Sequence, residues 1–312
     1  MRAARIHAFG PPAAIVVEQV ASAPPGPGEA LVRVGAAGVG NWDALVRSGR
    51  SGLDLSLPLT LGAEVAGAIE AVAAAPADGL NLEPGEAVYG STNSLFTAGY
   101  AELALCRVDM LTRRPPGLTA VDAASLPVAA AMAWQMIVEH ARVMSGQTVV
   151  VQGAAGNVGA LAVQIARSRG ADVVGTVRSA ADEATVRELG ATDVIRSQAD
   201  FSRLTRRADV VVDTVGGPSQ SLLFPLLVPG GLLVSSVSRP DAALAARVDA
   251  RVDYFITRVT AAALEEITKL VQSGRLRTRI GATMPLSEVR IAHEMLDGLL
   301  PRPQGKIVLS LQ

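Results

Sequence analysis

Cysteine, lysine and aromatic residues are scarce in this chain of 312 residues, and the scarcity of cysteine excludes whole classes of protein. The single cysteine, Cys106, rules out a disulfide framework and a structural zinc site built from cysteines. It is predicted to be a small buried hydrophobe. The three histidines, His7, His140 and His293, are scattered along the sequence and form no ligand pattern. Each is predicted to be an ordinary core or surface residue.

Charge and long apolar runs are limited too. The formal net charge is −1 and no run of like charges occurs, so nothing indicates a nucleic-acid surface. No stretch of about twenty uninterrupted apolar residues indicates a membrane span. The first residues are too polar for the apolar part of a signal peptide. We therefore expect a cytoplasmic protein, bound to neither nucleic acid nor membrane, whose length allows two domains.

The motifs of three other enzyme classes are missing. There is no G-x-x-x-x-G-K-[ST] loop for nucleotide hydrolysis and no G-x-S-x-G turn for a serine hydrolase. Short-chain dehydrogenases need Tyr-x-x-x-Lys. The residues four positions after the three tyrosines are Asn93, Ala104 and Arg258, so this motif is absent as well.

The most informative stretch is VVVQGAAGNVG, residues 149–159, which runs from a β-branched strand into a glycine-rich turn and then a helical pattern. Gly153, Gly156 and Gly159 permit a tight turn and a close approach of the backbone to phosphate. The start of the helix offers unpaired N–H groups to a pyrophosphate. We predict that the pyrophosphate of a dinucleotide lies against Gly153, Ala154, Ala155, Gly156, Asn157, Val158 and Gly159.

Further short apolar strands follow this turn and alternate with helical segments. They are expected at 171–177, 192–195, 206–217, 229–238 and 254–257. Such alternation predicts a doubly wound parallel sheet. Ligands of these sheets lie at the carboxyl ends of the strands. We therefore expect Val215, Gly216, Ser236 and Val237, which follow two of the strands, to border the cofactor.

The end of the second of these strands indicates which dinucleotide binds. NAD sites usually place Asp or Glu there to hold the ribose 2′-hydroxyl. Here Arg178 and Ser179 follow directly and no carboxylate is present. A guanidinium and a hydroxyl suit a 2′-phosphate, so we predict NADPH. The alternative is that Arg178 is an ordinary surface cation.

The regions before and after this α/β part have a different character. Residues 1–118 alternate in the manner of antiparallel strands, including one at 98–111, and the 115–117 turn suggests a boundary. A long apolar helix is expected at 129–143. The tail is expected to return to the first region. We predict a discontinuous domain of residues 1–118 and 260–312 and a Rossmann domain of residues 119–259.

In order and spacing, these motifs resemble the zinc-free, quinone-oxidoreductase-like branch of the medium-chain dehydrogenase/reductase superfamily. The resemblance covers essentially the whole chain. It rests on GAAGVGNWDALVRSG, LGAEVAGAIEAV, PGEAVYG, GYAELALCRVDML, AASLPVAAAMAWQMI, VVVQGAAGNVGALAVQIAR, ELGATDVI, DVVVDTVGG and GKIVL. It implies an α/β fold, with a GroES-like β-rich catalytic domain beside a Rossmann domain, an active site in the cleft between them, and a homodimer.

Zinc-dependent relatives carry a Cys ligand where this chain has Gly40, and Gly-His-Glu where it reads Gly62-Ala63-Glu64. A catalytic zinc needs about three protein ligands. The resemblance therefore implies a zinc-independent enzyme.

The resemblance also implies roles for single residues. Asn41 lies near nicotinamide and substrate in the family and is our candidate catalytic residue, with a helix N-cap as the alternative. Trp42 is expected to line the substrate pocket or to pack in the β domain. Met132 replaces a Thr of relatives and is expected to make the pocket more apolar. Lys306 is expected near the NADPH cleft or in a surface salt bridge.

The proton donor is not identified. Some relatives in enoyl reduction use a Tyr shortly after the Asn41 loop, but residues 48–53 contain none. Arg50 is either an oxygen clamp in its place or a solvated surface residue, and water is the remaining donor.

The predicted function is NADPH-dependent reduction of an enone or quinone by hydride transfer. Two alternatives remain open: a specialised biosynthetic reductase or redox-neutral cyclase on the same fold, and a non-catalytic NADPH-binding protein.

Overall fold

The computed structural model describes residues 1–73, 80–196 and 207–311. The chain divides into two compact units. Unit 1 consists of Met1–Val128, Arg258–Lys269 and Thr278–Gln312, and unit 2 consists of Ala129–Thr257 and Leu270–Arg277.

Unit 2 is built on a 6-stranded sheet with the order β11-β10-β9-β12-β13-β14. All its strand pairs are parallel. The strands are β9 (Thr148–Gln152), β10 (Asp172–Thr176), β11 (Asp193–Ile195), β12 (Ala208–Asp213), β13 (Leu227–Ser235) and β14 (Arg251–Tyr254). Every residue of β9 is buried, as expected for a central strand of a parallel sheet. The predicted doubly wound sheet is therefore confirmed.

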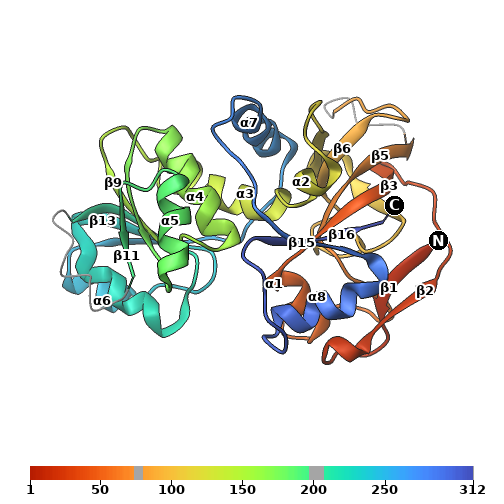
Figure 1. Ribbon diagram of the computed structural model, residues 1–312, viewed down its shortest axis with the longest axis horizontal. Helices are drawn as coiled ribbons and strands as arrows, with labels where there is room; N and C mark the ends of the chain where they lie inside the picture. The colour runs from red at the N-terminus through yellow and green to blue at the C-terminus, as the bar shows by residue number, and fades with distance from the viewer. Residues whose placement is uncertain (74–79, 197–206, 312) are drawn as a thin grey trace. The chain divides into compact units, whose positions relative to one another are not determined.

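Helices cover this sheet. They are α4 (Asn157–Ser168), α5 (Ala180–Glu188), the 3-10 segment η5 (Gly217–Leu226) and α6 (Ala242–Arg247). Helix α4 packs on β9 and β10, and α5 packs on β11. Figure 1 shows α4 and α5 side by side on one face of the sheet. The residues of α4 from Gly159 to Ala166 are buried, so this helix is well packed where it follows the glycine-rich turn.

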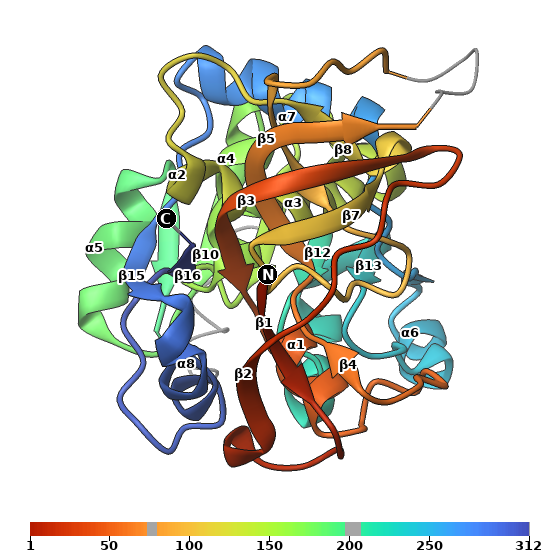
Figure 2. The ribbon, with the colours of Figure 1, turned by 90° about the vertical axis from the view of Figure 1, so that its right-hand side faces the viewer.

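Unit 1 is dominated by antiparallel strands. Its 7-stranded sheet has the order β15-β16-β3-β5-β6-β8, with β7 paired to β3, and a 3-stranded sheet has the order β2-β1-β4. The strands are β1 (Arg2–Ile6), β2 (Ile15–Gln19), β3 (Glu29–Val39), β4 (Leu59–Thr60), β5 (Glu64–Val72), β6 (Ala87–Ser91), β7 (Leu103–Arg107), β8 (Leu111–Arg113), β15 (Ile280–Pro285) and β16 (Lys306–Ser310). Figure 2 shows the long, curved β3 alongside β5 and β7.

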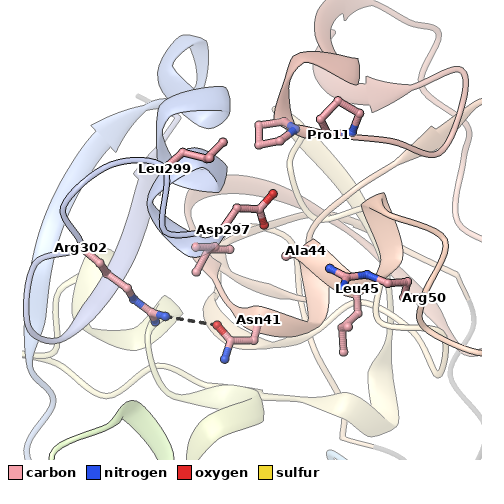
Figure 3. A pocket seen from close by; sticks show the side chains of 10 residues that line it. Pro11, Asn41, Ala44, Leu45, Arg50, Asp297, Leu299 and Arg302 are labelled. Atoms are coloured by element: carbon pink, nitrogen blue, oxygen red, sulfur yellow. Dashed lines mark hydrogen bonds between the residues drawn. The ribbon is translucent and has the colours of Figure 1, made fainter. Parts of the chain in front are cut away.

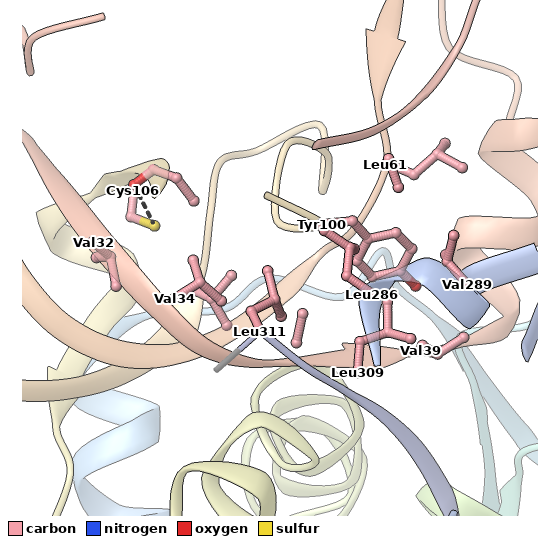
Figure 4. Close-up of a cluster of buried hydrophobic side chains, with 14 of the residues drawn as sticks. Val32, Val34, Val39, Leu61, Tyr100, Cys106, Leu286, Val289, Leu309 and Leu311 are labelled. Carbon is pink, nitrogen blue, oxygen red and sulfur yellow. Dashed lines mark hydrogen bonds between the residues drawn. The ribbon is translucent and has the colours of Figure 1, made fainter. Parts of the chain in front are cut away.

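The C-terminal strand β16 pairs with β3, which joins the end of the chain to its beginning. The helices of this unit are α1 (Asn41–Arg47), α2 (Ala120–Ala124), α7 (Ala261–Gln272, whose last turn belongs to unit 2) and α8 (Val289–Leu296). Its core combines early and late residues, among them Val32, Val34, Leu286, Val289 and Leu309 (Figure 4). Cys106 is buried in this core, as predicted.

Two expected elements differ from the structure. The helix expected at 129–143 is α3 (Pro127–Trp134) followed by a π-helical segment, η3 (Gln135–His140). There the Ala141 N–H bonds to the Met136 carbonyl, five residues back. The strand expected at 98–111 is interrupted by a 3-10 turn at Val108–Met110, which sends β7 to β3 and β8 to β6.

Other expected strands begin or end a few residues from the observed ones, and Arg206 lies outside the described residues. No helix in the described ranges is long and apolar enough to cross a membrane.

Candidate active site

The turn between β9 and α4 has the geometry of a phosphate-binding loop. Gly153 has a φ of +73°, a conformation that glycine adopts without strain. Gly156 is the N-cap of α4 and has no side chain to bond the first N–H groups of the helix. A Cβ on Gly159 would lie 2.2 Å from the Gly153 carbonyl oxygen, so only glycine permits this approach. The open helix N-terminus therefore fits a dinucleotide pyrophosphate.

Strand β10 holds this turn in place through Thr176. The Gly153 N–H donates to Thr176 Oγ1 at 3.2 Å, and the Ala154 N–H donates to the Thr176 carbonyl at 3.0 Å. A Cβ on Gly175 would lie 2.9 Å from the Ala154 Cβ, so Ala154 packs directly over β10. Sequence reasoning did not single out Thr176, because a threonine inside a strand looks like any other β-branched residue.

The predicted cofactor residues after β9, β12 and β13 converge. A Cβ on Gly153 would lie 2.7 Å from Val215 Cγ2, and one on Gly216 would lie 3.1 Å from Val237 Cγ2. The Val215 and Val237 side chains are exposed beside these glycines. The Ser236 hydroxyl instead shares a hydrogen bond of 2.9 Å with the Thr257 hydroxyl. The carboxyl ends of three neighbouring strands thus form one surface of unit 2, as the strand order requires.

Asp213, the last residue of β12, organises part of that surface. Its fully buried carboxylate accepts hydrogen bonds from the Val215 and Gly216 N–H groups, from Gln220 Nε2 and from Ser235 Oγ. Four donors compensate the burial of the charge. Sequence reasoning did not single out Asp213. The signal that could have found it is a carboxylate at the end of an apolar strand, three residues before a pair of glycines.

Arg178 and Ser179 follow β10 as predicted, and they differ in their hydrogen bonds to the described residues. Arg178 is exposed and makes no hydrogen bond or ion pair with any described residue. The Ser179 hydroxyl caps α5, since it accepts from the Asp182 N–H at 3.2 Å and donates to the Asp182 carboxylate at 2.7 Å. The sequence pattern did not reveal this capping role of Ser179.

In unit 1, Asn41 opens α1 without capping it. Gly40 is the N-cap, and its N–H donates to Asp43 Oδ2 at 2.8 Å, which completes a capping box from the side of the third residue. Asn41 Oδ1 accepts a hydrogen bond from Arg302 Nη1 at 3.2 Å. The N-cap alternative for Asn41 is therefore wrong. The Asn41 side chain stands in solvent-accessible space, with its amide NH2 group unbonded within the described chain.

Asn41 lines an open pocket of about 730 Å³ in unit 1. Helix α1, the residue Arg50 after it, the 11–12 segment, and the end of α8 with the segment that follows form this pocket. Its lining residues are Pro11, Pro12, Asn41, Ala44, Leu45, Arg50, Leu296, Asp297, Leu299 and Arg302 (Figure 3). Trp42 is not among them. Its ring packs against the core of unit 1 and meets Phe96 edge-on at 6.2 Å. Met132, in α3, is half-buried.

Lys306 and Glu64 form a buried ion pair that joins β16 to β5. Both side chains are almost inaccessible to solvent, and Glu64 also accepts the Val128 N–H at 2.8 Å. Lys306 is therefore not a surface residue. The expectation that it contacts a cofactor stays a prediction. Close packing surrounds the pair, since a Cβ on Gly38 would lie 2.7 Å from the Glu64 carboxylate and one on Gly40 would lie 3.3 Å from Lys306 Nζ.

Asp43 lies beside this pair, fully enclosed. Burial raises the pKa of Asp43 to about 7, although its hydrogen bond from Gly40 and the Lys306 charge pull the pKa down. Glu64 and Tyr100 also face it. Asp43 Oδ1 and the Tyr100 hydroxyl have no hydrogen-bond partner among the described residues. Burial, with the neighbouring Asp43 charge, raises the pKa of Tyr100 well above its ordinary value.

A second buried group, His293 with Arg47, also lies next to Tyr100. The His293 ring meets the Tyr100 ring edge-on at 6.0 Å. Arg47 Nη1 donates to His293 Nδ1 at 3.3 Å and Arg47 Nη2 donates to Asp297 Oδ2 at 2.6 Å. Burial and the Arg47 charge lower the pKa of His293 to about 3, so its ring is neutral.

None of these groups resembles a metal site. Within residues 1–73, 80–196 and 207–311, no three His, Cys, Asp or Glu side chains are placed to hold a metal ion.

The fold and the site together define a class of protein. A parallel-sheet unit with an open phosphate-binding turn, joined to an antiparallel unit with a ligand-sized pocket, is the architecture of dinucleotide-dependent oxidoreductases. Family models agree with this assignment. An alcohol dehydrogenase GroES-like domain matches residues 26–144, and a zinc-binding dehydrogenase domain matches residues 189–309.

Individual proteins narrow the assignment. The quinone oxidoreductase of Lama guanicoe is 30% identical, over 100% of this chain and 98% of that protein. A quinone oxidoreductase from Coxiella burnetii has a similar structure, with a TM-score of 0.87, 27% identity, and coverage of 100% of this chain and 99% of that one. An NAD-dependent alcohol dehydrogenase has a TM-score of 0.90 at 26% identity, and each chain covers 100% of the other.

The chain belongs to the quinone-oxidoreductase-like branch of the medium-chain dehydrogenase/reductase superfamily, and it is an oxidoreductase. Members of this superfamily bind a nicotinamide cofactor. The predicted family and the predicted fold, a GroES-like unit with a Rossmann-like unit, are confirmed.

Proposed function

We propose that the protein is an NADPH-dependent, zinc-independent reductase of activated double bonds, such as those of enones and quinones. The observation that carries this proposal is the Glu64–Lys306 ion pair beside Gly40. This chain keeps the dinucleotide turn but places an ammonium group where zinc-dependent relatives bind the metal. We therefore propose hydride transfer without a metal.

The residues around Gly40 do not fit a zinc ion. Gly40 and Ala63 offer no ligand atom. The Glu64 carboxylate already accepts from Lys306 and the Val128 N–H, and the buried ammonium of Lys306 repels a cation. Reduction of a simple ketone needs strong polarisation of the carbonyl, which zinc supplies in other enzymes. An enone or a quinone is electrophilic by itself and needs only orientation and hydrogen bonding.

The proposed chemistry is conjugate reduction, in which bound NADPH supplies a hydride to the β-carbon of the substrate. The enzyme then stabilises the negative charge that collects on the carbonyl oxygen. Asn41 is the proposed donor to that oxygen, because Arg302 engages its Oδ1 and leaves its NH2 group to donate. Water is the proposed source of the proton that reaches the α-carbon, because the Tyr100 hydroxyl is fully buried.

The preference for NADPH is proposed from Arg178. Its guanidinium has no partner among the described residues, and residues 177–179, which directly follow β10, include no carboxylate to bind a ribose 2′-hydroxyl. A 2′-phosphate would gain charge-assisted hydrogen bonds from Arg178. Ser179, which caps α5, is proposed to contribute to binding of the 2′-phosphate through its position at the start of that helix.

The test is oxidation of NADPH, with NADH in parallel, against benzoquinone, a linear enone, an unsaturated acyl thioester and a simple ketone. We expect turnover with quinone or enone and not with the ketone.

Arg178→Ala is expected to raise the KM for NADPH about tenfold or more and to leave the KM for NADH unchanged. Arg247→Ala, which removes an exposed arginine from α6 of the same unit, is the matched control. Product analysis separates a reductase from a redox-neutral cyclase. Tight NADPH binding without turnover would favour a non-catalytic protein.

We also propose a homodimer formed through unit 2. Among the strands of the described residues, β14 is an edge strand that pairs with β13 alone, and Ile256 just beyond it is 77% exposed. An unpaired edge flanked by an exposed apolar side chain favours pairing with a second copy. Light scattering of the wild type and of Ile256→Lys tests this, with a monomeric variant expected.

A further inference from the structure

The pocket that contains Asn41 carries an excess of positive charge. Among its lining residues, Arg50 and Arg302 are cations and Asp297 is the only carboxylate. Asp297 is already matched, since its Oδ2 accepts from the buried Arg47 guanidinium at 2.6 Å. The positive charges of Arg50 and Arg302 are therefore not balanced by a carboxylate among the lining residues.

Neither pocket cation has an acidic partner within the described chain. Arg50 Nε donates only to Ser48 Oγ, at 3.0 Å, and Arg302 Nη1 donates to Asn41 Oδ1, at 3.2 Å. Elsewhere, exposed arginines commonly pair with carboxylates, as Arg2 does with Glu102. Two guanidinium groups that face one pocket and lack carboxylate partners leave several N–H donors available to a ligand.

The other polar group of the pocket is also a donor. Figure 3 shows the hydrogen bond from Arg302 to Asn41 Oδ1. Because the Asn41 oxygen is engaged in this way, the Asn41 NH2 group is the part left to bond a ligand. The rest of the lining is largely apolar, with Leu45, Leu296 and Leu299. A ligand that matches this pocket has a short hydrocarbon body and a group rich in acceptors. The volume of about 730 Å³ suits a small molecule.

We propose that this pocket binds an oxyanion, a carboxylate or a phosphate, carried by the substrate, with Arg50 and Arg302 as its specificity-determining residues. This inference rests on the proposed function and narrows its substrate class to anionic enones or quinones. Arg302 has a second role as the positioning residue that orients the Asn41 amide. Arg50 keeps its hydrogen bond to Ser48 Oγ and acts on the ligand through the anion alone.

The first experiment measures binding without turnover. Calorimetric titration of the cofactor-bound protein compares levulinate, its uncharged methyl ester and inorganic phosphate. We expect levulinate or phosphate to bind about tenfold more tightly than the ester, with an affinity that falls as salt rises. Binding of levulinate identifies a carboxylate as the source, and binding of phosphate alone identifies a phosphate. Equal binding of acid and ester, or no binding of either anion, would overturn the inference.

Variants assign the effect to the two arginines. Arg50→Gln and Arg302→Gln are each expected to remove most of the preference for the anion, whereas Arg302→Lys, which keeps the charge, retains part of it. Arg275→Gln is a matched control, because Arg275 follows a Ser-Gly pair as Arg50 does and donates to Ser273 Oγ at 3.0 Å. An unchanged preference in both glutamine variants would contradict the proposal.

Turnover separates this inference from the proposed function. β-Acetylacrylate and its methyl ester are an anionic and a neutral enone of nearly the same shape. We expect a lower KM for the acid, an increase of that KM with unchanged kcat in Arg50→Gln, and changes in both constants in Arg302→Gln. Anion binding without turnover of either compound would uphold the pocket and refute the reductase. Equal turnover of both compounds would refute the anion preference and uphold the reductase.

Discussion

Asp43 and His293 are buried groups of unit 1 whose pKa values move in opposite directions. The pKa of Asp43 rises from 3.8 to about 7, and that of His293 falls from 6.5 to about 3. Between pH 3.8 and about 7 the folded protein keeps a proton on Asp43 that the unfolded chain has lost. Rising pH therefore destabilises the fold through Asp43. Between pH of about 3 and 6.5 the unfolded chain holds a proton that folded His293 lacks, so rising pH stabilises the fold.

These opposing contributions predict how two variants differ. In Asp43→Asn, the free energy of unfolding is expected to rise from pH 4 to 6.5 relative to wild type. In His293→Asn, it is expected to fall over the same interval. Each difference approaches about 1.4 kcal/mol per pH unit, the value for one proton. Asn at position 43 retains an oxygen for the Gly40 N–H, and Asn at 293 retains one for Arg47. Urea unfolding across pH measures the effect. Parallel profiles for wild type and both variants would contradict it.

Substitution of Gly159 tests the proposed nucleotide-binding turn separately from the rest of the site. Replacing glycine with alanine inside a helix normally gains about 1 kcal/mol. Here the new Cβ would lie 2.2 Å from the Gly153 carbonyl oxygen, so the turn and the helix must separate. Gly159→Ala is expected to weaken NADPH binding at least tenfold and to lower stability by about 1–3 kcal/mol. Gly10→Ala, where the Cβ meets only the Ala14 Cβ at an ordinary 3.6 Å, is the control. Fluorescence titration and thermal unfolding check both. Unchanged affinity would show that the turn adapts.

At this scale the sequence predicted some residues and could not predict others. The glycine spacing identified the turn, because backbone conformation depends mainly on local residue type. Arg302 was missed because it stands in an irregular segment after α8 and meets Asn41 across 261 positions of sequence. No periodic pattern reports such a contact. Glu64 and Lys306 likewise meet only when β16 returns to β3.

At the scale of elements, the Glu64–Lys306 pair links strands from opposite ends of the chain. Lys306→Met is expected to lower the free energy of unfolding by about 3–5 kcal/mol, since it leaves the Glu64 carboxylate buried with one remaining N–H partner. The double variant with Glu64→Gln is expected to recover much of that loss, because no charge remains buried. Lys269→Met removes an exposed, paired lysine and should have no measurable effect. A double variant no more stable than Lys306→Met would contradict this account.

Elements followed from the sequence where their pattern was regular. Strand β9 and helix α4 were predicted because β-branched residues, glycines and a helical period stand in immediate succession. Two expected elements, at 98–111 and 129–143, differ from the structure. Each is a continuous apolar stretch in the sequence, but its pattern of backbone hydrogen bonds changes partway along. Hydropathy cannot reveal a 3-10 turn at Val108–Met110 or a switch to π-helical bonding after Trp134.

At the scale of the whole molecule, the sheets of the two units differ in which parts of the chain supply their strands. The sheet of unit 2 is made from strands between Thr148 and Tyr254. The large sheet of unit 1 needs β16, which lies between β15 and β3 in its interior. Loss of β16 would separate β15 from the sheet, expose two strand edges and remove Lys306 from Glu64.

Ending the chain after Gly305 is therefore expected to unfold unit 1 and to leave the parallel sheet of unit 2 folded. Hydrogen exchange followed by mass spectrometry provides the measurement, because it reports protection segment by segment. Protection is expected to fall in β3 and β5 and to persist in β9 and β12, and the proposed binding of NADPH to the glycine-rich turn is expected to be retained. A truncated chain that loses protection equally in all four strands would show that the units fold as one cooperative structure. One that keeps protection in β3 would show that β16 is dispensable, which the buried Glu64 charge and the two broken strand pairings argue against.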